Sequence, residues 1–332
     1  MKERSAANIL TTSRWTRIIK WSSGVVMLVM FVIMFWLSRE PDVFWVNRSV
    51  DQESTAVGFS TTDTLVRVAE TLLDKPGGYL TNDKIPPNVF LDNIPSWEFG
   101  VLQQVRDMAR VIRNDYSRSQ SQSKEDAVVA KAEPLFYIDN TSWMLPAAES
   151  EYRGAIEGFA DYRDRLEISD PNTQFYARAD NLREWLAQVE KRLGSVTRRL
   201  GDSVTSSRIN ENLAGDAAAE AVGAQPDTVD VRTSWFQIDN VFFEARGTAW
   251  ALVHFFRAAE FDFAKVLADK NAEASVRQII RELEASLGPM HSPMILNGGG
   301  FGLFANHSLV MANYLARANA AVINLRELLD QG

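Results

Sequence analysis

The sequence of 332 residues has no cysteine, and its 35 basic residues are outnumbered by 43 acidic ones. Without cysteine the chain has no disulfides, no thiolate metal ligands and no cysteine nucleophile. The net charge of −8 disfavours contact with phosphate backbones, so no nucleic-acid partner is expected. Hydrophobic residues make up 46% of the chain, too many for a disordered protein, and the length allows at most about two domains.

Motifs of common catalytic and cofactor sites are also missing. The three histidines, His254, His291 and His307, do not have the His-Glu-x-x-His spacing of a zinc site. The stretch Asn297–Gly302 is rich in glycine but lacks the Lys-Ser/Thr end of a phosphate-binding loop, so we interpret it as a flexible turn between helices. A Gly-x-Ser-x-Gly nucleophile turn does not occur. The sequence therefore predicts no metal and no cofactor, and it favours a protein that is not an enzyme.

One long apolar run lies near the N-terminus. Trp21 to Leu37 are 17 residues without a formal charge, and residues 18–37 reach the ~20 residues that cross a bilayer. Lys20 can extend its ammonium group to the headgroups, and Trp21 and Trp36 lie near the two ends of the run, where indole rings favour the interface. The run is longer than the apolar part of a cleaved signal peptide. We therefore predict an uncleaved transmembrane anchor over residues 18–37, with the lipid bilayer as its partner.

The charges on either side of this run predict its orientation. Residues 1–20 carry five basic residues against Glu3 alone, a local charge of +4, and the rest of the chain carries −12. Positive flanks stay in the cytoplasm, so we expect a cytoplasmic tip over residues 1–17 and a body outside the membrane. In a Gram-negative cell this is a single-pass inner-membrane protein with its bulk in the periplasm. The lack of cysteine suits that oxidising compartment without requiring it.

The body is predicted to be all-α, a multi-helix bundle with long heptad-patterned helices. We expect a stalk, a first helical region, a flexible connector and a second helical region, over residues 38–60, 61–200, 201–233 and 234–332. The two helical regions form either two domains or one. Phe44, Trp45 and Val46 in the stalk are expected near the outer leaflet. Thr61-Thr62-Asp63 and Ser96 are expected to cap the first two helices.

The strongest periodic signal lies in the first helical region, where apolar residues step alternately by four and three. The repeat averages 3.5 residues and is typical of a coiled-coil seam. Two interpretations stay open: a seam inside the bundle of one chain, or self-association through that seam. Its central residues are Leu182, Leu186, Val189, Leu193, Val196 and Leu200.

Two alternatives to an interaction protein follow from single features. Glu149-Ser150 faintly resembles the Glu-Ser start of the lytic transglycosylase motif, which implies Glu149 as a general acid acting on glycan. The later Gly-Leu-Met-Gln-type segment is absent, and acidic residues in a first helical turn interact favourably with the helix dipole without any catalytic role.

The aromatic segment Trp235–Leu267 is a candidate wall for a lipid or small-ligand pocket. Five tryptophans are candidates either for sugar stacking or for the core: Trp97, Trp143, Trp185, Trp235 and Trp250.

The whole layout resembles a family of uncharacterised Gram-negative inner-membrane proteins, catalogued as a domain of unknown function. The features that carry the resemblance are the basic N-terminus, the anchor, Leu72–Tyr79, Ile94–Glu98 and Gly298–Gly302. The resemblance implies one anchor followed by a helical periplasmic domain, and it supplies no catalytic residues. Our prediction is a membrane-anchored, non-enzymatic interaction or scaffold component of the cell envelope, with an envelope protein or a second copy as partner.

Overall fold

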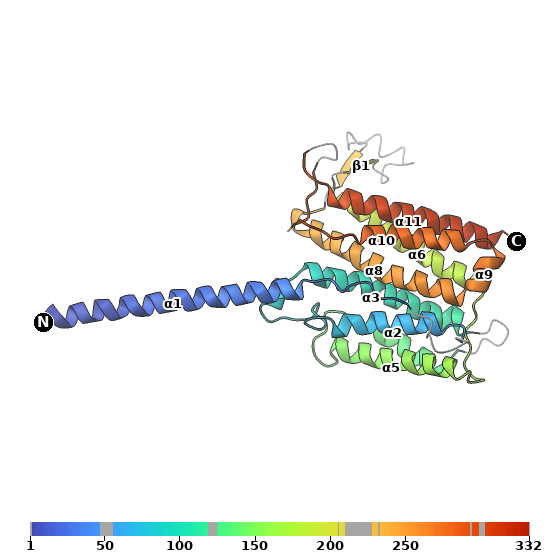
Figure 1. Cartoon of the computed structure of the whole chain (residues 1–332), viewed down its shortest axis with the longest axis horizontal. Coiled ribbons are helices and arrows are strands. Elements are labelled where there is room, and N and C mark those ends of the chain that lie inside the picture. The colour runs from blue at the N-terminus through green and yellow to red at the C-terminus, as the bar shows by residue number, and fades with distance from the viewer. Residues whose placement is uncertain are drawn as a thin grey trace, which may run out of the picture.

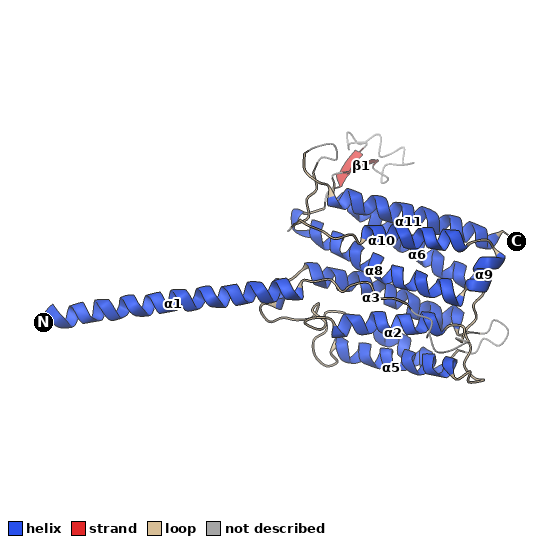
Figure 2. Ribbon diagram, in the orientation of Figure 1, coloured by secondary structure: helices blue, strands red, loops and turns tan. Residues whose placement is uncertain are grey.

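The computed structural model of the chain describes residues 2–46, 56–118, 125–204, 206–209, 228–231, 233–292, 294–298 and 303–331. A long helix, α1 (Lys2–Leu37), projects from one end of a bundle of helices (Figure 1). In Figure 2 the described chain is helical apart from loops and one small ribbon of two strands. The prediction of an all-α fold with one N-terminal apolar helix is confirmed.

The bundle consists of long helices joined by short helical turns. The long helices are α2 (Phe59–Asp74), α3 (Asn93–Val111), α5 (Ala148–Glu167), α6 (Ala179–Asp202), α8 (Ile238–Asp262), α10 (Glu273–Ser286) and α11 (His307–Asp330). The short ones are η1 (Asn88–Phe90), the π-helical turn η2 (Ile112–Tyr116), α4 (Ala127–Ala132), η3 (Glu133–Tyr137), η5 (Trp235–Gln237) and α9 (Ala264–Asp269). Strands β1 (Ser206–Ile209) and β2 (Thr228–Val231) pair antiparallel inside the predicted connector. Most of that connector lies outside the described residues, as does Gly299–Gly302 of the glycine-rich stretch.

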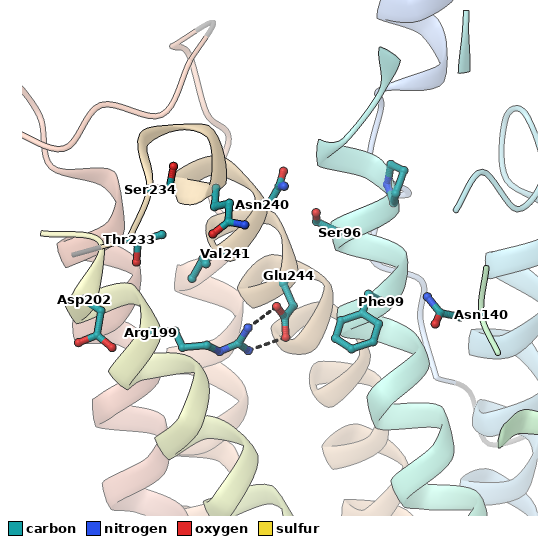
Figure 3. Close-up of a pocket in the computed structure, with 12 residues that line it drawn as sticks. Ser96, Phe99, Asn140, Arg199, Asp202, Thr233, Ser234, Asn240, Val241 and Glu244 are labelled. Atoms are coloured by element: carbon teal, nitrogen blue, oxygen red, sulfur yellow. Dashed lines mark hydrogen bonds and ion pairs between the residues drawn. The ribbon is translucent and has the colours of Figure 1, made fainter. Parts of the chain in front are cut away.

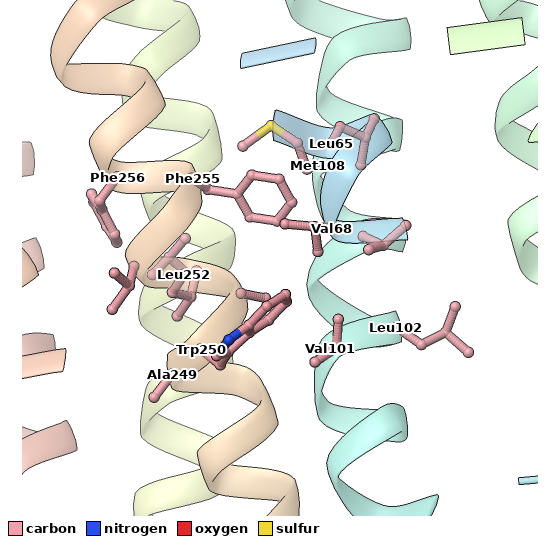
Figure 4. Packing of buried hydrophobic residues seen from close by; sticks show 14 of the residues in the cluster. Leu65, Val68, Val101, Leu102, Met108, Ala249, Trp250, Leu252, Phe255 and Phe256 are labelled. Carbon is pink, nitrogen blue, oxygen red and sulfur yellow. The ribbon is translucent and has the colours of Figure 1, made fainter. Parts of the chain in front are cut away.

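The core forms where α3 and α8 lie side by side. Figure 4 shows Trp250 and Phe255 pointing from α8 toward α3, where Val101 and Met108 lie. All four side chains are buried, and burial of each stabilises the fold by roughly 1.5–3 kcal/mol. Because α3 comes before the predicted connector and α8 after it, one core is shared by helices of both predicted regions.

Two glycines allow α3 and α8 to approach closely. A Cβ atom on Gly100 of α3 would lie 2.2 Å from the carbonyl oxygen of Glu244. A Cβ atom on Gly247 of α8 would lie 2.0 Å from the carbonyl oxygen of Trp97. Neither position has room for any other residue, so the two backbones touch at this crossing.

The seam predicted from the heptad pattern lies inside a single chain. Leu182, Leu186, Val189, Leu193, Val196 and Leu200 are all buried on α6, which packs along α11. The facing helix has its own apolar stripe at the same spacing, including Met311, Leu315 and Val322, and this stripe is buried too. The seam residues are therefore not accessible to a second copy while the bundle is folded.

The predicted caps are wrong at both of the first two helices of the bundle. The first, α2, begins at Phe59 after Gly58, and its free amides are held by Asp262 from the end of α8. Oxygens of Asp262 accept hydrogen bonds from the amides of Gly58 (3.0 Å) and Thr61 (2.6 Å). Ser96 lies inside α3, where its hydroxyl donates to the carbonyl of Asp92 (2.7 Å). A side chain distant in sequence replaces the local cap, which local patterns do not reveal.

Candidate functional site

The turn after α2 is fixed by a buried ion pair. The Lys75 ammonium bonds Oε1 of Glu98, and the two side chains are 1% and 0% exposed. The Glu98 carboxylate also accepts hydrogen bonds from the amides of Leu80 and Thr81, both at 2.8 Å, and Lys75 donates to the carbonyl of Gly78. Both charges are thereby paired and hydrogen-bonded, as buried charges require. The segments Leu72–Tyr79 and Ile94–Glu98, which carry the family resemblance, meet at this pair.

Residues 38–46 form an extended strap that lies along α8. Two residues of extended chain advance roughly 6.6 Å and four residues of helix roughly 6 Å, so alternate strap residues meet successive turns of the helix. The contacts follow this register, from Glu40 through Asp42 to Phe44. Four side chains at helical spacing on one face of α8 hold the strap: Arg246, Trp250, His254 and Arg257.

Arg246 makes the strongest of these contacts. Its guanidinium donates to both carboxylate oxygens of Glu40 at 2.7–2.9 Å, and it also donates to the carbonyls of Leu287 (3.3 Å) and Gly288 (3.1 Å) after α10. A bidentate, charge-assisted pair with little solvent access is both strong and directional. Arg246 therefore ties the strap, α8 and the loop after α10 together.

His254 holds the middle of the strap. Its side chain is fully buried, Nε2 accepts a hydrogen bond from the amide of Phe44 (3.1 Å), and Nδ1 lies 2.6 Å from the carbonyl oxygen of Trp250. This arrangement requires a neutral ring with its proton on Nδ1. Burial lowers the pKa of His254 to about 3, and the nearby cations of Arg257 and Arg67 act in the same direction. We therefore assign His254 a role in holding the strap rather than in proton transfer at neutral pH.

The expectation that Phe44 and Val46 lie on an outer leaflet is wrong. The Phe44 ring lies between the His254 ring, with centroids 3.8 Å apart, and the Arg67 guanidinium, 4.1 Å from the ring centroid. Val46 is buried, and of these three residues only Trp45 is exposed. Aromatic residues in a stalk suggest lipid contact by composition, but here the rings have protein partners.

The strap joins the bundle directly to α1. Leu37, the last residue of α1, is 5% exposed and packs over Gly77, whose φ of 89° and missing side chain leave room for it. Thr16–Leu37 is apolar and long enough to cross a membrane. The predicted anchor residues Lys20, Trp21 and Trp36 all project from this stretch and are exposed. Bundle and apolar helix are thus connected without an intervening free linker.

A first cleft lies where α3 and α8 begin and α6 ends (Figure 3). Its volume is about 570 Å³, and its lining includes Ser96, Phe99, Asn140, Arg199, Asp202 and Glu244. Figure 3 shows the Arg199 guanidinium paired with both oxygens of the Glu244 carboxylate, which raises the pKa of Arg199. Because the Arg199–Glu244 pair neutralises itself, the cleft offers a ligand hydroxyl and amide groups, the Asp202 carboxylate and one aromatic ring.

A second cleft, of about 530 Å³, lies between α8, the end of α10 and the start of α11. Its lining is more apolar and includes Phe242, Met290, His291, His307, Met311 and Tyr314. Nδ1 of His307 accepts a hydrogen bond from the amide of Leu296 (2.9 Å), so this histidine holds the loop before α11. The N-terminal turns of the aromatic segment Trp235–Leu267 thus line clefts, whereas its central rings fill the core.

The remaining predicted residues are spread over the molecule. Glu149 lies in the first turn of α5, where its carboxylate accepts a hydrogen bond from Asn82 (2.7 Å), and it lines neither cleft. Of the five tryptophans considered for sugar stacking, Trp143 and Trp235 are exposed and the other three are core residues. Within the described part of the chain, no three His, Asp or Glu side chains gather in a group that fits a metal ion.

The sequence analysis did not identify the strap-binding face of α8. The available signal was the set of Arg246, His254 and Arg257 at helical spacing in a stretch of α8, residues 246–257, that holds no other ionisable side chain.

A family model described as "Uncharacterized protein conserved in bacteria (DUF2333)" matches residues 10–332, so the chain belongs to that family, and the resemblance noted above is confirmed. No curated protein and no solved structure matches the chain.

Proposed function

We propose that this member of the DUF2333 family is a non-enzymatic interaction component of the bacterial cell envelope. In this proposal α1 crosses the inner membrane, the N-terminus is cytoplasmic, and the bundle lies in the periplasm. The observation that carries the proposal is the strap, which clamps the bundle to the end of the apolar helix through Glu40–Arg246 and Phe44–His254. A bundle on a flexible tether would move through a volume around its anchor, whereas a bundle that is clamped to the anchor presents fixed surfaces at a fixed height above the membrane.

The orientation is supported by the charges around α1. The basic residues before the apolar stretch favour retention in the cytoplasm, and the acidic body follows it. Alkaline phosphatase fused after residue 332 is expected to be active, because it folds outside the cytoplasm. The matched control is the same fusion to a chain that lacks residues 16–37, which is expected to be inactive. An inactive full-length fusion, with normal expression, would reverse the proposed orientation.

The first cleft is the surface that we propose for the partner, an envelope protein. It is open, and it combines the Phe99 ring with the amide of Asn140 and hydroxyls such as Ser96. A photo-crosslinking residue in place of Phe99 or Asn140 is expected to trap a discrete adduct in intact cells, identified by mass spectrometry. The same residue in place of Ile168, exposed at the other end of the bundle, is the control. Recovery of uncrosslinked monomer alone from every position would overturn the proposal.

The second cleft favours a second candidate function, binding of a lipid or small apolar ligand. Its lining combines Phe242, Met290 and Met311 with Tyr314, which suits a largely apolar molecule with one polar group. Mass spectrometry of the purified chain under native conditions is expected to find a bound lipid. Replacing Met311 by Trp would fill the cleft and should remove that lipid while the helical content stays unchanged. Equal lipid binding by both chains would exclude this cleft as the site.

A further inference from the structure

The end of the bundle that joins α1 is formed by four segments, and we call it the proximal end (Figure 1). They are residues 75–92, residues 138–147, residues 233–237, and the described part of 287–310, which is 287–292, 294–298 and 303–310. The segments are linked to one another. Asn82 of the first segment donates to the carbonyl of Ser142 in the second (2.9 Å). Asn297 of the fourth segment donates to the carbonyl of Ser203 (3.3 Å), and the Ser203 hydroxyl bonds that of Thr233 in the third (3.3 Å). The first cleft lies between Asn140 of the second segment and Ser234 of the third, and Arg246 joins the strap to the fourth. They therefore make one continuous face.

Large apolar side chains are exposed on every segment of this face. Leu145 is 89% exposed and Phe236 is 82% exposed, and Phe90 and Leu303 also project into solvent. Among the described residues outside α1, the large apolar side chains that are exposed elsewhere are Trp45, Val57, Tyr137 and Ile168. A single exposed apolar residue has no special meaning, but a group of them on one face marks a contact surface.

The same segments contain few charged residues. Residues 85–91, 140–148, 233–238 and 303–312 contain no Asp, Glu, Lys or Arg, although such residues make up 23% of the chain. Each stretch contains a Trp or a Phe. Uncharged segments with aromatic tips are typical of the membrane–water interface, where the rings lie at the level of the headgroups.

The position of α1 identifies the surface that this face meets. The apolar stretch Thr16–Leu37 ends against the bundle, since Phe35 is 69% exposed and Leu37 only 5%. Figure 1 shows the loops of the proximal end level with the last turns of α1. The headgroup layer is roughly 5–8 Å thick on each side of the hydrocarbon, so a face level with the end of the span lies inside it.

We propose that the proximal end of the bundle is a membrane-binding face, seated in the headgroup layer of the bilayer that α1 crosses. Leu145, Phe236 and Leu303 insert among the lipid headgroups, and the two clefts open close to the membrane surface. This inference rests on the proposed function in that α1 must span the bilayer. It adds that the bundle itself contacts lipid and is not held away from it.

The absence of cysteine allows a direct test. Leu145→Cys, Phe236→Cys and Leu303→Cys, each in the full-length chain, are labelled with an environment-sensitive dye and reconstituted into vesicles of phosphatidylethanolamine and phosphatidylglycerol. Vesicles that also contain a phosphatidylcholine spin-labelled at a shallow acyl position are expected to quench the dye severalfold at these three sites. Ile168→Cys, an exposed apolar position at the opposite end, is the matched control and is expected to show no quenching.

A second control separates this inference from the proposed anchor. Phe31→Cys places the dye within the apolar stretch of α1. If residue 31 is quenched but residues 145, 236 and 303 respond like residue 168, the anchor stands and the membrane-binding face is disproved. If residue 31 is not quenched, the membrane anchor itself is disproved. If the dyes at the proximal end remain in water in vesicles that contain no other protein, the proposed lipid contact is disproved. That result would favour a protein partner on this face.

Discussion

The two ends of the bundle are closed by opposite kinds of side chain. The distal end, formed by residues 112–118, 125–126, 165–181 and 262–273, is rich in charged groups that pair across helices, such as Arg165 with Asp126 (2.8 Å). The proximal end has apolar tips and keeps its central ion pair, Lys75–Glu98, completely buried. The contrast is one of degree: the described proximal segments carry a few charges outside the protein, such as Lys84, whereas the distal end is closed by many. Few exposed charges at the proximal end are what the proposed contact with lipid requires.

The largest expected effect concerns the buried pair of the proximal end. Lys75→Met leaves the Glu98 carboxylate buried without its cation, which should lower the free energy of unfolding by about 3–5 kcal/mol. Urea unfolding of the detergent-solubilised full-length chain, followed by circular dichroism, measures this loss. The second variant, Lys75→Met with Glu98→Gln, removes the uncompensated charge and should recover part of the stability.

The matched control for this prediction is an exposed ion pair. Arg277 bonds Glu260 (2.8 Å) while remaining largely in solvent, so Arg277→Met should leave the urea midpoint of unfolding nearly unchanged. If the two single variants unfold at the same urea concentration, the buried pair contributes no more than a surface pair, and the contrast between the two kinds of site fails.

A smaller effect is expected from pH at the strap. Burial holds the pKa of His254 near 3, below its value of about 6.5 in the unfolded chain, so the unfolded state binds more protons between these values. The stability from this group is complete above about pH 6.5 and falls on acidification, by roughly 2 kcal/mol at about pH 5. The midpoint of thermal unfolding, measured from about pH 7 to about pH 5, should fall accordingly.

The control for this prediction keeps the hydrogen bond and removes the titration. In His254→Gln the side-chain carbonyl is still an acceptor for the amide of Phe44, and the amide group does not ionise. This variant should be less stable than the parent at neutral pH and should lose less on acidification. A pH dependence identical to that of the parent would mean that other groups carry it.

The sequence predicted those features that depend on neighbouring residues in the chain. The apolar residues that repeat along α6 are all buried, because a helix that covers a core turns the same face toward that core every three or four residues. The apolar stretch of α1 follows from length and composition alone.

The sequence did not predict the features that depend on contacts between distant residues. Glu40 and Arg246 are 206 residues apart, and Asp262 caps a helix 201 residues before it. Nothing local in residues 38–46 distinguishes a strap from a free stalk. The sequence did not predict the first cleft for the same reason, since Arg199 and Glu244 come from different helices and belong to no motif. The envelope partner stays a prediction.

The smallest expected effect lies at the distal end and has the opposite pH dependence from that of His254. Burial, together with the carboxylates of Glu184 and Asp180, raises the pKa of Asp115 to about 6. The native state therefore binds more protons than the unfolded state between about pH 4 and about pH 6, so this group's contribution declines as the pH rises through that range. Asp115→Asn removes the buried charge and should stabilise the chain at neutral pH by up to about 1 kcal/mol, a value reduced for partial exposure.

Thermal unfolding of Asp115→Asn and the parent at about pH 7.5 and about pH 4.5 checks this prediction, because the advantage of the variant should shrink at the lower pH. Glu184→Gln is the matched control: it removes one repulsive neighbour and should give a smaller gain in the same direction. If Asp115→Asn is no more stable than the parent at the higher pH, the Asp115 carboxylate ionises without penalty. The distal end would then tolerate charge everywhere, which would sharpen its contrast with the proximal end.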